Sequence, residues 1–129
     1  MINQDVIIEN TKQFVKSTLM SAEGGHDWFH VERVLKTAVY IAKKEKASLF
    51  TVKLGALLHD IADSKFHEGN EEIGPLIAEK FLKSQNISQS DLEHVINIIK
   101  YVSFKNSFDN TVFESIELEI IKDADRLDA

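Results

Sequence analysis

The spacing of hydrophobic residues along the chain predicts helices throughout. In each long segment apolar residues recur three and four positions apart, which places them on one face of a helix. No segment alternates apolar and polar residues for long enough to indicate a strand. The pattern therefore predicts an all-α fold. The expected helices cover approximately residues 4–20, 26–46, 49–63, 75–84, 90–102 and 112–129.

Residues with known preferences for helix ends mark the expected boundaries. Gly24-Gly25 follows the first segment, and glycine commonly ends helices. Ser48 is an expected N-cap, because its side-chain oxygen can accept a backbone N–H bond. Pro75 suits a first helical turn. Ser88 opens a Ser-Gln-Ser-Asp sequence that resembles a capping box with Asp in place of Glu. Polar loops are expected at residues 64–70 and 103–111.

The stretch from Leu57 to Asp63 combines a hydrophobic face with two adjacent polar residues. Apolar residues at positions 54, 57, 58 and 61 predict the buried face of one helix. On that helix His59 and Asp60 would lie about 100° apart, so that an imidazole nitrogen and a carboxylate oxygen lean toward one point. Burying an unpaired carboxylate is costly. The pair therefore either binds a cation or lies exposed at the edge of the helix.

Composition narrows the class of protein. A chain of 129 residues with 43% hydrophobic and 28% charged residues is typical of one globular domain. The formal net charge of -6 argues against nucleic acid or an anionic membrane as the main partner. The absence of cysteine excludes disulfides, thiol catalysis and thiolate zinc sites. No signal peptide or membrane-length apolar run is present, so we expect a cytoplasmic protein. No sequence feature specifies an oligomeric state.

Three further places contain residues of the types that bind metals. His26 and His30 are four residues apart and share one helix face, although capping or hydrogen-bonded core histidines would look the same. The Asp63–His67 segment follows the His-Asp pair, and its alternative is a solvated turn. Asp123 and Asp125 lie in the C-terminal half of a helix, where the helix dipole disfavours acids. A nearby cation would explain them, and so would simple surface exposure.

Taken together, these residues indicate a single metal site in place of the separate structural roles. Two imidazoles and two carboxylates from three helices would form a mixed nitrogen and oxygen site suited to Mn²⁺, Fe²⁺, Zn²⁺ or Mg²⁺. Such a site leaves positions for water and phosphate oxygens, and the metal lowers the pKa of bound water. Lys65, Lys105 and Arg126 are then candidates to neutralise phosphate charge.

Five blocks of sequence resemble one known family. The order His30, His59-Asp60, Asp125 resembles the H…HD…D signature of the HD-domain metal-dependent phosphohydrolases. The amino-acid sequence around this signature is similar to that of the bacterial YpgQ/YedJ-like subgroup, from about residue 20 to the last residue. The similar blocks are Gly25–Val31, Ala56–Asp63, Lys65–His67, Ser103–Lys105 and Asp123–Ala129.

This resemblance implies a single HD domain over residues 1–129, built as a bundle of about six helices. It implies one divalent metal, with Mn²⁺ as first choice and Mg²⁺, Fe²⁺, Zn²⁺, Ni²⁺ or Co²⁺ as alternatives. In many relatives an acidic residue at the position of Asp63 is proposed to handle the attacking water or the leaving-group proton. The residues implied are His30, His59, Asp60 and Asp125 as metal ligands, Asp63, Lys65 and His67 in catalysis, and His26, Lys65, Lys105 and Arg126 in substrate binding.

The resemblance also implies a reaction. Members of the subgroup are similar to nucleotide pyrophosphohydrolases, which cut a (d)NTP to a monophosphate and pyrophosphate, so a small-molecule nucleotide is the expected partner. Other HD proteins remove a 5′-phosphate or cleave other phosphodiesters, and a non-catalytic metal- or nucleotide-binding remnant is a further alternative. The family continues with more helices after the Asp123–Ala129 block, so we expect this HD domain to be truncated.

A zinc protease is the weaker enzymatic alternative. The segment His26-Asp27-Trp28-Phe29-His30 has the spacing of the H-E-x-x-H motif. Asp27 replaces the glutamate of that motif and is one methylene short of the water that the glutamate must reach. The two preceding glycines also place His26 at the edge of the helix.

Overall fold

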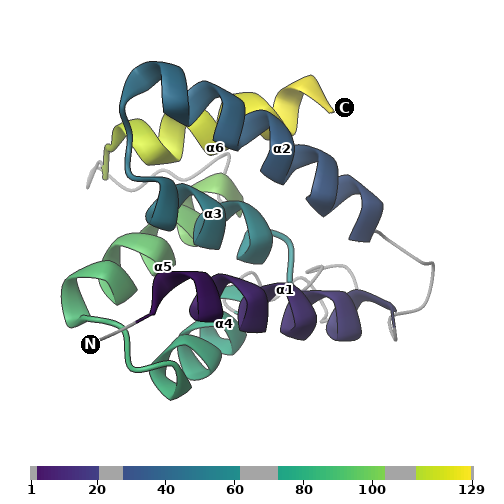
Figure 1. Cartoon of the computed structure of the whole chain (residues 1–129), viewed down its shortest axis with the longest axis vertical. Coiled ribbons are helices and arrows are strands. Elements are labelled where there is room, and N and C mark those ends of the chain that lie inside the picture. The colour runs from purple at the N-terminus through teal and green to yellow at the C-terminus, as the bar shows by residue number, and fades with distance from the viewer. Residues whose placement is uncertain (1–2, 21–27, 62–72, 104–112, 129) are drawn as a thin grey trace.

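The computed structural model describes residues 3–20, 28–61, 73–103 and 113–128, which contain six α-helices (Figure 1). No strand occurs in these ranges, so the prediction of an all-α fold is confirmed. The helices are α1 (Gln4–Met20), α2 (Trp28–Glu45), α3 (Leu49–Leu58), α4 (Ile73–Ser84), α5 (Gln89–Ser103) and α6 (Ile116–Leu127).

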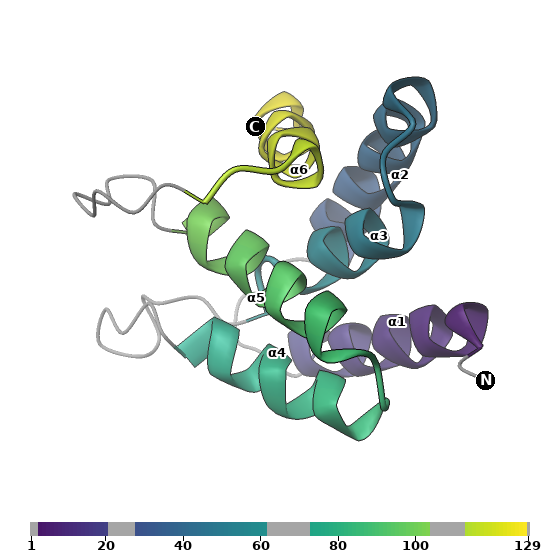
Figure 2. The same cartoon turned by 90° about the vertical axis from the view of Figure 1, so that its left-hand side faces the viewer.

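Helix α3 lies at the centre of the fold and packs against α1, α2, α5 and α6. Figure 2 shows α2 and α6 on one side of α3 and α5, with α1 and α4 on the other. From Phe50 to Leu58 every residue of α3 except Lys53 is buried. The sequence predicts one buried face for this segment, but the whole helix is apolar and enclosed, as is typical of a central helix.

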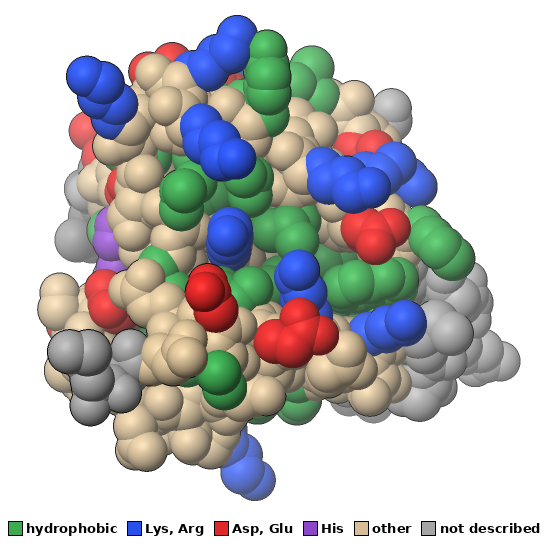
Figure 3. All heavy atoms as spheres, in the orientation of Figure 1, with side chains coloured by type: hydrophobic (Ala, Val, Ile, Leu, Met, Phe, Trp, Pro, Cys, Tyr) green, Lys and Arg blue, Asp and Glu red, His purple; other side chains and the backbone are tan. Residues whose placement is uncertain are grey.

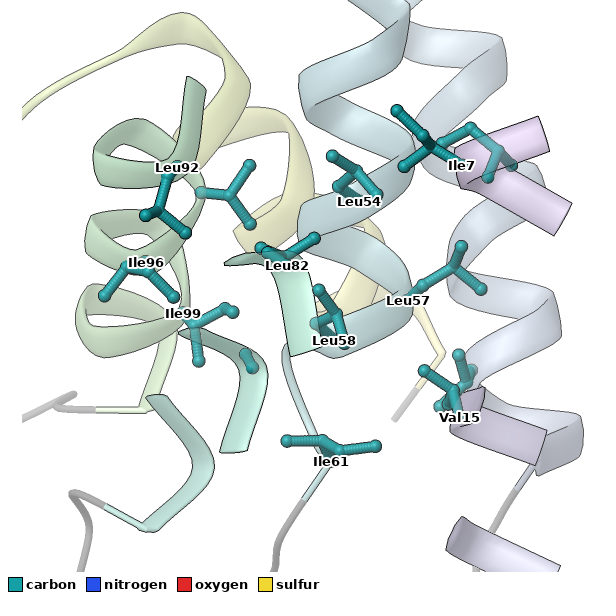
Figure 4. Packing of buried hydrophobic residues seen from close by; sticks show 14 of the residues in the cluster. Ile7, Val15, Leu54, Leu57, Leu58, Ile61, Leu82, Leu92, Ile96 and Ile99 are labelled. Carbon is teal, nitrogen blue, oxygen red and sulfur yellow. The ribbon is translucent and has the colours of Figure 1, made fainter. Parts of the chain in front are cut away.

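Two hydrophobic clusters flank α3 and hold the other helices against it. In the first, leucines of α3 lie between Ile7 and Val15 of α1 and the isoleucines of α5, and Leu82 of α4 closes the cluster (Figure 4). The second cluster joins α3 to α2, α5 and α6. It contains the fully buried Val34 of α2 and Ile121 of α6. Because α3 is packed on both sides, it fixes the position of the residues that follow Leu58.

Most of the expected helix ends are confirmed. The Ser48 side chain accepts a hydrogen bond from the backbone N–H of Thr51 at 3.3 Å and caps α3. Ser88 does the same for Asp91 at the start of α5. Pro75 lies in the first turn of α4. These side chains satisfy N–H groups that have no partner within the helix.

Two predicted boundaries are wrong. Helix α3 ends at Leu58, and the backbone N–H of Ile61 bonds the carbonyl of Leu58, so His59 and Asp60 lie in a turn and not within the helix. Helix α6 begins at Ile116 and not near residue 112, because Ser115 caps it by accepting the N–H of Leu118. The loop expected at 103–111 begins at least one residue later, because Ser103 still belongs to α5. The rest of that loop, the loop expected at 64–70 and the Gly24-Gly25 stop lie outside the described residues.

The surface carries charges of both signs. On the face drawn in Figure 3, acidic and basic side chains are interspersed with hydrophobic ones. Among the described residues, no helix has the length and apolar character that a membrane crossing requires.

Candidate metal centre

The four residues expected to bind a metal come together where α3 ends. His30 lies in the first turn of α2, His59 and Asp60 follow the last residue of α3, and Asp125 lies in the last turn of α6. Helices α2 and α6 pack against α3 and against each other. This packing brings together side chains as far as 95 positions apart in the sequence.

The distances within this group are short. His30, His59 and Asp60 each offer a ligand atom, and these atoms lie within 4.8 Å of one another. Asp125 Oδ1 lies 3.0 Å from His30 Nε2 and 3.4 Å from His59 Nε2. His59 is buried and Asp60 is exposed. The site therefore has a buried floor and a side that is open to solvent.

The protonation of His59 follows from its hydrogen bond to the backbone. Its Nδ1 lies 2.6 Å from the carbonyl oxygen of Ala56. A carbonyl oxygen only accepts hydrogen bonds, so Nδ1 carries the proton and Nε2 of the neutral ring carries a lone pair. Among the described residues, this buried Nε2 has no hydrogen-bond partner. A buried polar atom without a partner is costly, so its position indicates a ligand.

His30 is held by a side chain that the sequence analysis did not single out. Its Nδ1 lies 2.5 Å from Asp128 Oδ2, and Arg33 donates to both oxygens of the Asp128 carboxylate. The carboxylate accepts the proton of Nδ1. In the neutral ring this tautomer leaves a lone pair on Nε2, which lies 3.0 Å from Asp125 Oδ1, so both imidazoles direct Nε2 toward the same carboxylate.

These groups fit a divalent cation. The Nε2 atoms of His30 and His59 lie 3.0 and 3.4 Å from the same oxygen of Asp125, and when both rings are neutral with the proton on Nδ1 none of these three atoms is a donor. Acceptors this close repel one another unless a cation or a proton lies between them. Neutral imidazole nitrogens and carboxylate oxygens are the ligands that Mn²⁺, Fe²⁺ and Zn²⁺ accept.

The charges of the group shift the pKa values of its members. Burial acts to lower the pKa of His59, but the carboxylates of Asp125 and Asp60 outweigh it, and the pKa is raised above 6.5. The His59 imidazole lowers the pKa of Asp125 below 3.8, although burial opposes this effect. The Arg33 guanidinium is the main cause that lowers the pKa of Asp128 to about 2. Both carboxylates are therefore ionised at neutral pH, as metal binding requires.

A close approach of α3 and α6 positions two of these residues. An added Cβ on Gly55 would lie 2.5 Å from Ile121 Cδ1 and 3.1 Å from Ile98 Cγ2, so any larger residue requires these side chains to move. His59 lies four residues after Gly55, and Asp125 lies four residues after Ile121. The tight contact therefore lies one helical turn before the place where His59 and Asp125 meet.

Of the other residues expected from the sequence to act in catalysis or substrate binding, the structure describes only Arg126. Arg126 is exposed and donates to Asp123 at 3.0 Å, one turn back on α6. Five lie outside the described residues, namely His26, Asp63, Lys65, His67 and Lys105. Their roles stay predictions.

Comparison with known families decides between the alternatives. The profile of the HD domain family matches residues 28–129. The chain belongs to the HD domain family. The match spans the stretch that supplies His30, His59, Asp60 and Asp125, so the resemblance noted in the sequence is confirmed. It favours this family over the zinc-protease alternative.

Individual relatives agree with this assignment. The chain is 37% identical to the Bacillus subtilis protein YpgQ over 124 residues, which is 94% of this chain and 59% of YpgQ. The crystal structure of an HD-superfamily hydrolase from Bacillus thuringiensis is similar, with a TM-score of 0.79, 33% identity, and coverage of 98% of this chain and 59% of that one. The structure of YpgQ in complex with ADP has a TM-score of 0.77 and 34% identity, and covers 97% and 59%. The chain thus spans about 59% of the length of these relatives.

Proposed function

We propose that this protein is a metal-dependent phosphohydrolase that acts on a nucleotide. In this proposal it cleaves a (d)NTP to a monophosphate and pyrophosphate with Mn²⁺, and His30, His59, Asp60 and Asp125 hold the metal. The observation that carries the proposal is the meeting of the Nε2 atoms of His30 and His59 with the Asp125 carboxylate. The similarity to YpgQ, which has been crystallised with ADP, supports a nucleotide as the substrate class.

In this proposal the described residues bind the metal and leave one side of it open to the substrate. His59, which bonds the Ala56 carbonyl, forms a buried floor, and exposed Asp60 lies on the side from which a solvated phosphate could enter. A divalent ion bound there would supply a water of lowered pKa and would polarise a phosphoryl group. The roles proposed for Asp63, Lys65, His67, His26, Lys105 and Arg126 in proton transfer and phosphate binding rest on the family resemblance alone.

The test is an ion-exchange separation of products after the metal-stripped protein is incubated with a panel of nucleotides, with and without Mn²⁺. We expect monophosphate and pyrophosphate to form only with Mn²⁺, and turnover to be lost in Asp60→Asn, which keeps the size of the side chain and removes its charge. Glu119→Gln is the matched control, because it removes an exposed carboxylate that pairs with Lys122 on α6.

Other products would change the conclusion. Free phosphate from monophosphates would keep the metal site and make the protein a 5′-nucleotidase. Metal binding without turnover of any nucleotide would favour a binding protein. Full activity in Asp60→Asn would overturn the assignment of the site.

A further inference from the structure

We propose that Asp128 and Arg33 are positioning residues that set the tautomer and the orientation of the His30 imidazole for metal binding. His30 Nδ1 lies 2.5 Å from Asp128 Oδ2. Arg33 donates to Oδ1 of the same carboxylate through Nε at 2.7 Å and to Oδ2 through a terminal nitrogen at 3.1 Å. This proposal rests on the metal site of the proposed function and adds two residues that act through a ligand.

An imidazole binds a metal through the nitrogen that lacks a proton, and the hydrogen bond at the other nitrogen decides which one that is. The two histidines of this site differ in what makes that bond. His59 bonds the backbone carbonyl of Ala56, whereas His30 bonds the side chain of Asp128. The tautomer of His30 therefore depends on a residue that can be replaced.

Arg33 completes the arrangement because it binds both oxygens of Asp128. A carboxylate held by two parallel N–H bonds cannot rotate away from His30 without losing one of them. The same spacing occurs on both helices, since Arg33 lies three residues after His30 and Asp128 lies three residues after Asp125. Helices α2 and α6 thus face each other through two successive layers of contacts, one at the metal site and one behind it.

Asp128→Asn separates a positioning role from simple structural support. The bond of Arg33 Nε to Oδ1 is the shorter of its two bonds, 2.7 Å against 3.1 Å, so it keeps an oxygen at the Oδ1 position. The amide NH₂ then takes the Oδ2 position, where the bond to the terminal nitrogen of Arg33 is lost and the amide donates to His30 Nδ1. His30 is then forced to carry its proton on Nε2, which blocks metal binding. Asp128→Ala leaves both tautomers accessible and is expected to be milder. Structural support alone predicts the reverse order, because asparagine keeps the shape and one of the two bonds to Arg33, whereas alanine keeps neither.

The first measurement is the affinity for Mn²⁺ by isothermal titration calorimetry. We expect a loss of about 10-fold for Asp128→Ala and about 100-fold for Asp128→Asn, the range found when groups that orient metal ligands are removed. Arg33→Met in the Asp128→Asn protein releases the amide to turn over, and should bring affinity back to the level of Asp128→Ala. Circular dichroism checks the fold, and Glu119→Gln should bind as the wild type does.

A second measurement needs no metal. At about pH 9, where imidazole is neutral, the ¹⁵N chemical shifts of His30 report which nitrogen is protonated. We expect Nδ1 in the wild type and Nε2 in Asp128→Asn. Weaker loss for Asn than for Ala, or an Nε2-protonated His30 in the wild type, would overturn the proposal. Failure of the wild type to bind Mn²⁺ would count against the proposed function instead, and the tautomer would still decide the role of Asp128.

Discussion

The contact between α3 and α6 at Gly55 gives a prediction that links packing to the metal site. In a typical helix, replacing glycine by alanine is stabilising by about 1 kcal/mol, because alanine loses less conformational entropy. Gly55 lies in the middle of α3, but a Cβ there would meet Ile121 Cδ1 at 2.5 Å and Ile98 Cγ2 at 3.1 Å. We therefore expect Gly55→Ala to destabilise the protein.

The magnitude follows from the two opposing effects. Carbon atoms in contact normally lie about 3.5–4.0 Å apart, so the Ile121 methyl must move by about 1 Å or more. Ile121 and Ile98 are fully buried, so the displaced atoms move toward other core side chains and not into solvent. Overpacking a core costs about 1–3 kcal/mol, and the helix propensity of alanine returns about 1 kcal/mol. The net loss should be about 1 kcal/mol, or roughly 3–5 °C in Tm for a domain of this size.

A shift of α6 would also affect the site. Asp125 lies one turn after Ile121 and His59 one turn after Gly55, so pushing the helices apart lengthens the 3.4 Å contact between His59 and Asp125. We expect the affinity for Mn²⁺ to fall by up to about tenfold, the lower end of the effects seen when groups that orient metal ligands are disturbed.

The assay is chemical denaturation of the metal-free protein, with calorimetric titration of Mn²⁺ in parallel. Ile121→Val is the matched second variant, because it removes the Cδ1 atom that clashes. Alone it should cost about 0.5–1.5 kcal/mol. Combined with Gly55→Ala, the loss should fall short of the sum by at least about 1 kcal/mol, as expected for residues in contact. A Gly55→Ala protein that is more stable than the wild type and binds Mn²⁺ equally well would refute the reasoning.

Two further predictions concern a buried acid and the pH. Glu117 Oε2 accepts the backbone N–H of Ser48 at 2.9 Å, so Glu117→Ala should cost roughly 1–2 kcal/mol in urea denaturation. Glu117→Gln keeps an acceptor and should cost less; equal losses would contradict this role. His59 has a raised pKa, so its charged form contributes stability to the metal-free protein that is complete below pH 6.5 and is lost as the pH rises through the raised pKa. Metal binding needs the neutral ring, so the rise in Tm caused by Mn²⁺ should grow between about pH 6 and pH 8, and a rise that is independent of pH would contradict this assignment.

Hydrophobic spacing predicted the six helices correctly, but it misplaced the end of α3 and the start of α6. The period of α3 continues through Ile61, which is 3% exposed, although the helix stops at Leu58. Ile61 lies in the turn after the helix and is buried there. Its apolar character at this spacing therefore resembled a continuation of the helix. At the other error, Ser115 begins α6 by capping Leu118, and a serine inside an apolar pattern was not recognised as a boundary. In both cases the tertiary contacts or the cap decided the end of the helix, and periodicity did not.

Residue type and order predicted which side chains come together, and their role as metal ligands stays a prediction. His30, His59, Asp60 and Asp125 were grouped because of their chemistry and order, and the structure brings them together. Asp128 and Arg33 were missed, because their contact exists only once α2 and α6 pack together. The repeated three-residue spacing after His30 and after Asp125 was the available signal, but it has meaning only if the two helices are known to be neighbours.

The end of α3 at Leu58, which the sequence did not predict, explains how a buried and an exposed candidate ligand can lie next to each other. A helix enclosed on nearly all sides by apolar residues cannot carry a charged ligand along its length, because an unpaired buried carboxylate is too costly. The turn after Leu58 solves this problem, since it keeps His59 buried and bonded to Ala56 while Asp60 reaches solvent. Had α3 continued as predicted, the two side chains would have been fixed by the 3.6-residue period alone. The stop at Leu58 therefore lets one buried and one exposed candidate ligand lie side by side at the end of the central helix of the fold.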